Sequence, residues 1–291
     1  MCTHLLKQKE RCLILTGNEM KSASIGIFDS GFGGLTVMNA VTDLLPNEHI
    51  TYFADTANLP YGNKTPEEIL NFSYQSIEFL ANQGIKLLVI ACHTSCATAL
   101  PFLRKQFSFP ILAISDSGIK ELLSQKKTDT LAFLATQTTV NSQLYQQALQ
   151  SKFSKCTILA IACPLFVPLL EMGYVNQPLL TQSIIHESLH PLKTYKDPID
   201  AVLLACTHYP LLKNPIQKEL GLQTLLIDPS ASCAQEAKQM LIQNNLINET
   251  CSPGKHLFYV SNNPDRFQSA GKLFSNFPLD PVFCVQESSL L

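Results

Sequence analysis

Two short stretches, Leu87-Leu88-Val89-Ile90-Ala91-Cys92-His93-Thr94 and Ala201-Val202-Leu203-Leu204-Ala205-Cys206-Thr207-His208, decide how the chain folds. Each begins as an apolar run of the kind that forms a strand buried on both faces of a parallel sheet. Each run ends on Ala-Cys and continues with one His and one Thr, in opposite orders. Ligands of open α/β sheets bind at the carboxyl ends of the strands. Two thiols at two such ends therefore predict two half-sites that face one another.

The rest of the chain alternates between segments typical of strands and segments typical of helices. Thr65-Pro66-Glu67-Glu68 is a clear helix start, because Thr caps the helix, Pro suits its first turn and Glu68 completes a capping box. This alternation predicts an α/β fold with mostly parallel sheets flanked by helices. We expect strands at 25–28, 49–54, 87–92, 111–115, 130–135, 157–162, 201–206, 224–227, 256–260 and 282–285, and helices at 35–45, 66–81, 116–124, 141–150, 179–189, 211–220 and 234–243.

Length and composition indicate a globular protein of one or two domains, without a strongly charged partner. The chain has 291 residues, of which 46% are hydrophobic, and its formal net charge is −2. No Lys/Arg run forms a basic patch for nucleic acid, and no apolar run reaches the roughly 20 residues of a membrane span. We therefore expect neither nucleic acid nor membrane as a partner.

Residues 1–24 are polar and are expected to form a flexible N-terminal extension. Met1 and Met20 are both candidate translation starts. The segment lacks the apolar core of about 7–15 residues that a signal peptide needs, so a cytoplasmic location is expected. In that reducing compartment the ten cysteines are expected to be thiols, most of them small buried residues.

The turn Asp29-Ser30-Gly31-Phe32-Gly33-Gly34 follows the first expected strand. It lacks the third glycine of the dinucleotide fingerprint, because position 36 is Thr36. The acid in the turn disfavours a phosphate ligand and favours a cationic group such as an ammonium. The N–H groups of the turn suit a carboxylate. The alternative is a glycine-rich turn with no ligand.

Three chemistries are open to the paired cysteines. Cys92-His93-Thr94-Ser95-Cys96 lacks the Cys-x2-Cys spacing of structural zinc sites, and no second cluster completes a ligand set. A thiol nucleophile with a His base leaves the second matched cysteine unexplained. Two thiols on opposite sides of one carbon fit a two-base racemase, in which a thiolate takes a proton and a thiol returns one to the opposite face.

Such a site makes severe demands, because an amino-acid α-proton is a very weak acid and an ordinary thiol has a pKa of about 8.5. It needs donors for the α-carboxylate, and Ser30, Thr94 and Thr207 are the candidates. It also needs groups that tune the thiols, and Asp29 and His208 are the candidates by position.

Further motifs lie in order over about residues 25–235, and with them the chain resembles the cofactor-independent glutamate racemases of bacteria. The matching stretches are Ile27 to Leu35, Asp55-Thr56-Ala57, Pro60-Tyr61-Gly62, Ala91-Cys92 with Thr94, Ala135-Thr136, Thr139-Val140, Tyr145, Cys163 to Pro168, Glu171, Gly173, and Cys206-Thr207-His208-Tyr209-Pro210-Leu211-Leu212.

The resemblance implies two similar α/β domains, 25–115 plus 229–291 and 116–228, with the active site in the cleft between them. It implies that Cys92 serves D-glutamate with support from Asp29, and that Cys206 serves L-glutamate with support from Glu171 and His208. It also implies that D-glutamate feeds peptidoglycan precursors, that no cofactor or metal takes part, and that the protein can be a homodimer. The expected substrate-binding residues are Asp29, Ser30, Pro60, Tyr61, Gly62, His93, Thr94, Thr136, Thr139, Thr207 and His208.

Two residues depart from the family pattern. His93 stands where the family usually has an Asn that contacts the substrate carboxylate, and Asn58 stands where an Arg is common. The His93 ring can donate a hydrogen bond, especially when protonated, or can crowd the pocket. We expect His93 to keep a substrate role but to lower or reshape activity. The alternatives are a related aspartate or hydantoin racemase, or a low-activity binding protein on the same scaffold.

Overall fold

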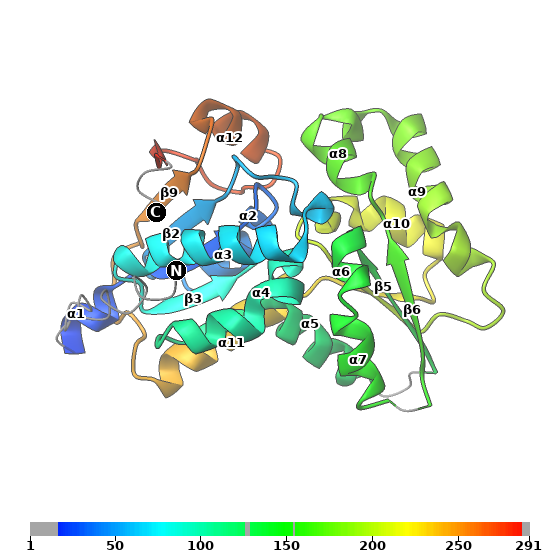
Figure 1. Ribbon diagram of the computed structural model, residues 1–291, viewed down its shortest axis with the longest axis horizontal. Coiled ribbons are helices and arrows are strands. Elements are labelled where there is room, and N and C mark those ends of the chain that lie inside the picture. The colour runs from blue at the N-terminus through cyan, green and yellow to red at the C-terminus, as the bar shows by residue number, and fades with distance from the viewer. Residues whose placement is uncertain (1–16, 126–128, 154, 287–291) are drawn as a thin grey trace.

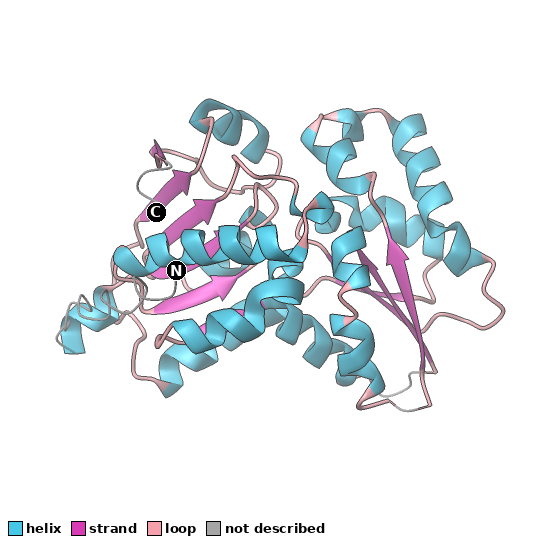
Figure 2. Ribbon diagram, viewed as in Figure 1, coloured by secondary structure: helices cyan, strands magenta, loops and turns pink. Residues whose placement is uncertain are grey.

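Two parallel sheets, each flanked by helices, make up the protein (Figures 1 and 2). The computed structural model describes residues 17–125, 129–153 and 155–286. The six-stranded sheet has the order β10-β9-β2-β1-β3-β4, with β1 Ile25–Asp29, β2 Ile50–Ala54, β3 Leu87–Ile90, β4 Ile111–Ala113, β9 His256–Val260 and β10 Val282–Cys284. The four-stranded sheet has the order β6-β5-β7-β8, with β5 Thr130–Ala135, β6 Thr157–Ala162, β7 Ala201–Ala205 and β8 Leu225–Ile227.

Every strand pair is parallel, so the predicted α/β class is confirmed. We call the two sheets with their flanking helices the six-stranded lobe and the four-stranded lobe. The strands of each lobe fall within one of the two predicted domains, whose boundaries stay a prediction.

The helices cover the sheets and connect successive strands. Thr65 caps α3 and forms the predicted capping box with Glu68. The helices are α2 Leu35–Leu44, α3 Pro66–Asn82, α4 His93–Gln106, α5 Ile114–Leu123, α6 Gln137–Asn141, α7 Leu144–Gln150, α8 Phe166–Glu171, α9 Pro178–Lys193, α10 Lys213–Leu220, α11 Ser230–Gln243 and α12 Pro264–Gly271. Short 3-10 turns occur at η1 Tyr61–Asn63, η2 Tyr174–Asn176 and η3 Tyr209–Leu212. None of the helices in the described ranges is long and apolar enough to cross a bilayer.

Several elements differ from the sequence prediction. The helices α4, α8 and α12 were not predicted, and α4 follows Cys92 directly; α6 shares only Asn141 with the predicted helix at 141–150. The α4 segment opens with polar residues and contains Pro101, which hides the helical pattern. Residues 1–16 of the predicted flexible extension lie outside the described residues, but Gly17–Ser22 form a short helix, α1.

The last two described strands belong to the same sheet as the first. Strand β9 pairs with β2, and β10 pairs with β9. Lys86, just before β3, forms an ion pair with Glu48, just before β2. Its ammonium lies 2.5 Å from Glu48 Oε2, and both side chains are almost fully buried. Glu48 Oε1 in turn accepts a 2.7 Å hydrogen bond from the backbone N–H of Asn248. A buried ion pair therefore connects the two ends of the six-stranded lobe.

Lys86→Met is predicted to destabilise the protein by about 3 kcal/mol, because it leaves the buried Glu48 carboxylate without its cation. Urea unfolding at pH 7 measures the loss. Lys21→Met is the matched control, since Lys21 forms a solvent-exposed ion pair with Glu249, and its expected cost is below about 1 kcal/mol. Equal losses in the two variants would show that burial of the Lys86 pair adds nothing.

Candidate active site

One cavity receives side chains from the carboxyl ends of both sheets. Cys92 follows β3 in the six-stranded lobe, and Cys206 follows β7 in the four-stranded lobe. Both line the same cavity, so the structure brings the two matched stretches together. Ten other residues predicted for the site also line it, namely Ser30, Pro60, Tyr61, Gly62, His93, Thr94, Thr136, Glu171, Thr207 and His208.

Asp29 and Thr139 do not line the cavity but lie fully buried behind residues that do. Eight lining residues were not among the predicted site residues, namely Gly31, Leu59, Asn63, Gln137, Cys163, Pro164, Val167 and Pro168. Each of them lies inside a recognised motif or beside one of its residues. Their proximity to those motifs is the sequence feature that could have identified them.

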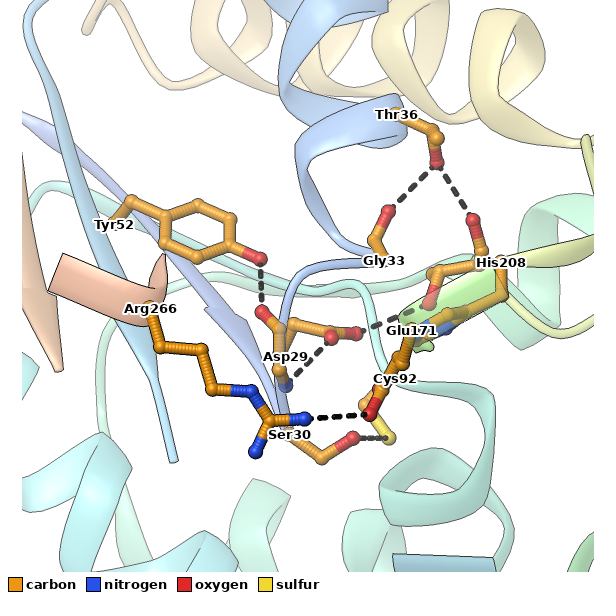
Figure 3. Close-up of polar contacts among 11 residues, drawn as sticks. Asp29, Ser30, Gly33, Thr36, Tyr52, Cys92, Glu171, His208 and Arg266 are labelled. Atoms are coloured by element: carbon orange, nitrogen blue, oxygen red, sulfur yellow. Dashed lines mark hydrogen bonds and ion pairs between the residues drawn. The ribbon is translucent and has the colours of Figure 1, made fainter. Parts of the chain in front are cut away.

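The Cys92 thiol lies at the start of α4, next to the first turn of the chain. Its Sγ donates a hydrogen bond to Ser30 Oγ at 3.4 Å (Figure 3). Burial, together with the charge of Asp29, raises the pKa of this thiol to about 11, although hydrogen bonds from Ser30 and Ser95 oppose the shift. A thiolate at this position is therefore a strong base, but only a small fraction of the Cys92 thiol is ionised near neutral pH.

Asp29 is the polar centre of the contact between the lobes. Its Oδ2 accepts the Gly31 N–H at 2.9 Å, and its Oδ1 accepts the Thr207 hydroxyl of the other lobe at 3.3 Å. Burial raises the pKa of the Asp29 carboxyl, although His208 acts in the opposite direction. The carboxyl is thus electrostatically coupled to groups on both sides of the cavity.

Cys206 has a comparable setting in the four-stranded lobe. Burial raises its pKa well above the ordinary value, the His208 backbone N–H opposes this, and the charges of Cys92, Asp29 and Glu171 add to it. His208 Nε2 lies 3.0 Å from Glu171 Oε1 at the end of α8. Glu171 and His208, each expected to support Cys206, therefore contact one another next to the second thiol.

Three threonine hydroxyls form a closed cluster where α4 meets α6. Thr94 and Thr136 are 3.0 Å apart, Thr136 and Thr139 are 3.0 Å apart, and Thr139 donates to Thr94 at 3.3 Å. Only Thr94 and Thr136 reach the cavity. Thr139 hydrogen-bonds the other two hydroxyls from behind the cavity wall, and its predicted contact with substrate stays a prediction.

The loop that carries Pro60, Tyr61 and Gly62 is anchored by a buried carboxylate. Asp55 accepts the Tyr61 hydroxyl at 2.6 Å and the Ser261 hydroxyl at 2.7 Å. The Tyr61 hydroxyl is thus engaged with Asp55 and does not serve as a free donor to a substrate. The ring and the neighbouring loop residues shape the cavity wall.

His93 lines the cavity as a neutral imidazole. Its Nδ1 lies 2.5 Å from the Tyr145 hydroxyl, and its side chain is 2% exposed. Burial lowers the pKa of the ring to about 3. The ring is therefore uncharged near neutral pH, so the stronger donation expected of its protonated form does not apply there. Within the described residues, no group of three or more His, Cys, Asp or Glu side chains is arranged to hold a metal ion.

Two parallel α/β lobes with a thiol from each in one cavity indicate the class of protein: an amino-acid racemase. The chain belongs to the Asp/Glu/hydantoin racemase family, whose model matches residues 25–237.

Glutamate racemases are among its similar relatives. One from Lysinibacillus sphaericus is 38% identical over 249 residues, which cover 85% of this chain and 92% of the relative. The crystal structure of a glutamate racemase from Bacillus anthracis matches with a TM-score of 0.85 at 30% identity, covering 91% of this chain and 98% of the other. That of the Francisella tularensis glutamate racemase, in complex with D-glutamate, matches with a TM-score of 0.84 at 33% identity over 91% of this chain and 98% of the other. The predicted family is confirmed.

Gly33→Ala is predicted to lower racemase activity by about a hundredfold, because displacement of catalytic groups by about 1 Å has effects of that size. An added Cβ would overlap Thr207 Oγ1 and lie 2.5 Å from His208 Nδ1, so the lobes would separate. Gly31→Ala in the same turn is the control with the smaller expected loss, since its Cβ meets nothing closer than Leu59 Cδ2 at 3.4 Å. Steady-state rates of racemisation by the two variants test this prediction. Similar losses of activity in both would contradict the steric explanation.

His93→Asn is predicted to change both activity and the pH dependence of stability. The ring is neutral when folded and has its ordinary pKa of 6.5 when unfolded. The unfolded chain therefore binds more protons between about pH 3 and 6.5, and stability falls as the pH falls through that window. The variant should lose less stability than the wild type between pH 7 and pH 4 in urea unfolding.

The same variant tests the catalytic effect of His93. Its kcat or KM for racemisation should differ from the wild-type value, because the cavity gains the smaller amide. His190→Asn on α9 is the exposed control, expected to behave as wild type. Racemisation by His93→Asn that equals the wild type within error would remove any special role for this residue.

Proposed function

We propose that this protein interconverts L- and D-glutamate by transferring the Cα proton between Cys92 and Cys206. The observation that carries the proposal is the presence of these two thiols, one from each lobe, in the lining of a single cavity. Their position allows one thiol to act on each face of a carbon held between them. The glutamate racemases among the relatives, one of them crystallised with D-glutamate, support glutamate as the substrate.

In the proposed reaction, one thiolate removes the α-proton and the opposite thiol delivers a proton to the other face. Burial raises the pKa of both thiols, so each thiolate is a stronger base than an exposed one. The proton that leaves each thiol needs an acceptor. We assign Asp29 to Cys92, and the Glu171–His208 pair to Cys206. Cys92 then serves D-glutamate and Cys206 serves L-glutamate.

The cavity lining suits a small dicarboxylic amino acid. The hydroxyls of Ser30, Thr94 and Thr136 line the cavity as candidate donors to carboxylate oxygens, whereas the Thr207 hydroxyl donates to Asp29. Leu59, Pro164, Val167 and Pro168 provide apolar walls that limit water around the reacting carbon. We further propose that the reaction needs no cofactor, that D-glutamate supplies peptidoglycan precursors in the cytoplasm, and that the protein can act as a homodimer.

Cys92→Ser and Cys206→Ser are each predicted to abolish racemisation, since a serine hydroxyl is far too weak an acid to form the required base. Each variant should retain exchange of the α-proton with solvent deuterium for one enantiomer, L-glutamate for Cys92→Ser and D-glutamate for Cys206→Ser. Circular dichroism follows racemisation, and proton NMR in D2O follows exchange. Cys163→Ser is the control, because this buried cavity thiol has no assigned proton-transfer role.

Full racemisation by either serine variant would reject the two-base proposal. A panel of L- and D-aspartate, hydantoins and glutamate tests the substrate, and faster turnover of another compound would reject glutamate. Binding of glutamate without any change in optical activity would favour the alternative of a binding protein.

A further inference from the structure

Helix α12 of the six-stranded lobe lies opposite helix α8 of the four-stranded lobe (Figure 1). Arg266 of α12 points toward Glu171 at the end of α8, with 3.9 Å between Nη2 and Oε2 (Figure 3). Its guanidinium also lies over the ring of Phe32, 5.9 Å from the centroid. Phe32 belongs to the turn that carries Ser30, the partner of Cys92. Arg266 is thus connected to the surroundings of both thiols without lining the cavity.

A second residue of the same segment contacts the other member of the pair. The ring of Phe274 packs edge-on against His208 at 5.1 Å and stacks with Phe32 at 6.3 Å. Both Arg266 and Phe274 lie beyond residues 25–237, the range that the family model matches. The C-terminal tail therefore contributes contacts to the Glu171–His208 pair from the opposite lobe.

The two oxygens of Glu171 have separate partners. Oε1 lies 3.0 Å from His208 Nε2, whereas Oε2 faces Arg266. A carboxylate engaged at both oxygens cannot rotate freely, so the cation restricts the orientation of the oxygen that holds His208. The Glu171 side chain is 10% exposed and that of Arg266 is 52% exposed. An ion pair with such an exposed partner contributes little to folding, and its loss should leave the fold intact.

We propose that Arg266 is a positioning residue, which holds Glu171 and through it His208 in the orientation that serves Cys206 when the lobes close on the substrate. This inference rests on the proposed glutamate racemisation. It implies an asymmetric effect: loss of Arg266 slows proton transfer at Cys206 and leaves proton transfer at Cys92 unchanged.

The experiment compares Arg266→Gln and Arg266→Lys with the wild type. Lys272→Gln is the control, because it removes a positive charge just after α12 that forms no ion pair within the described residues. In Arg266→Gln, kcat/KM should fall about two- to fivefold, the range expected for an exposed ion pair. The fall must be equal in the two directions, because the two enantiomers have equal free energies. Arg266→Lys should restore most of the loss.

Isotope effects identify the slowed step. With 2-deuterated L-glutamate the primary isotope effect on kcat/KM should rise in Arg266→Gln, because abstraction by Cys206 becomes more rate-limiting. With 2-deuterated D-glutamate it should fall, because reprotonation by Cys206 then limits the rate after abstraction by Cys92. A merely structural role reduces the amount of active enzyme and moves neither isotope effect.

Three results would overturn the inference: wild-type kinetics in Arg266→Gln, the same kinetics in Lys272→Gln, or a lower rate with both isotope effects unchanged. Thermal unfolding checks the fold, and a destabilised Arg266→Gln with unchanged isotope effects counts against the inference. A wild-type protein that does not racemise glutamate would instead reject the proposed function.

Discussion

The close contact between Asp29 and Thr207 is the constraint on which the site depends. The Thr207 hydroxyl of one lobe reaches a fully buried carboxylate of the other, and the Thr36 hydroxyl accompanies it by donating to the Thr207 carbonyl at 3.1 Å. Gly33 leaves the space for this approach, since any side chain there would occupy the position of Thr207. The strand ends of the two lobes can approach because Gly33 has no side chain and because the short Thr207 side chain hydrogen-bonds to the buried Asp29.

This contact also sets the electrostatics of the cavity. A buried carboxylate between two buried thiols disfavours both thiolates, and burial raises the pKa of all three groups. Each added negative charge is costly in such a place, so the three groups cannot all be ionised together. The arrangement suits a reaction in which at least one of the two thiols keeps its proton at every stage.

The sequence was sufficient for the fold class and for most of the site. Apolar runs that end in Ala-Cys identify buried parallel strands, and the strand-end rule then places Cys92 and Cys206 each at the carboxyl edge of its own sheet. The protonation state of His93 was not predictable, because it depends on the burial of the ring in the folded protein. The hydrogen bonds of Thr139 with Thr94 and Thr136 were not predictable either, because they depend on how α4 and α6 pack.

The two halves of the site are less alike than their sequences. His93 and Thr207 follow the matched cysteines, yet the first is a neutral ring held by Tyr145 within the cavity and the second joins the lobes through Asp29. Cys206 is supported by a chain that runs from His208 to Glu171 and on to Arg266, ending at solvent. Cys92 has Ser30 and the buried Asp29 beside it. Under the proposed mechanism, a reaction between mirror-image compounds is thus served by two different environments.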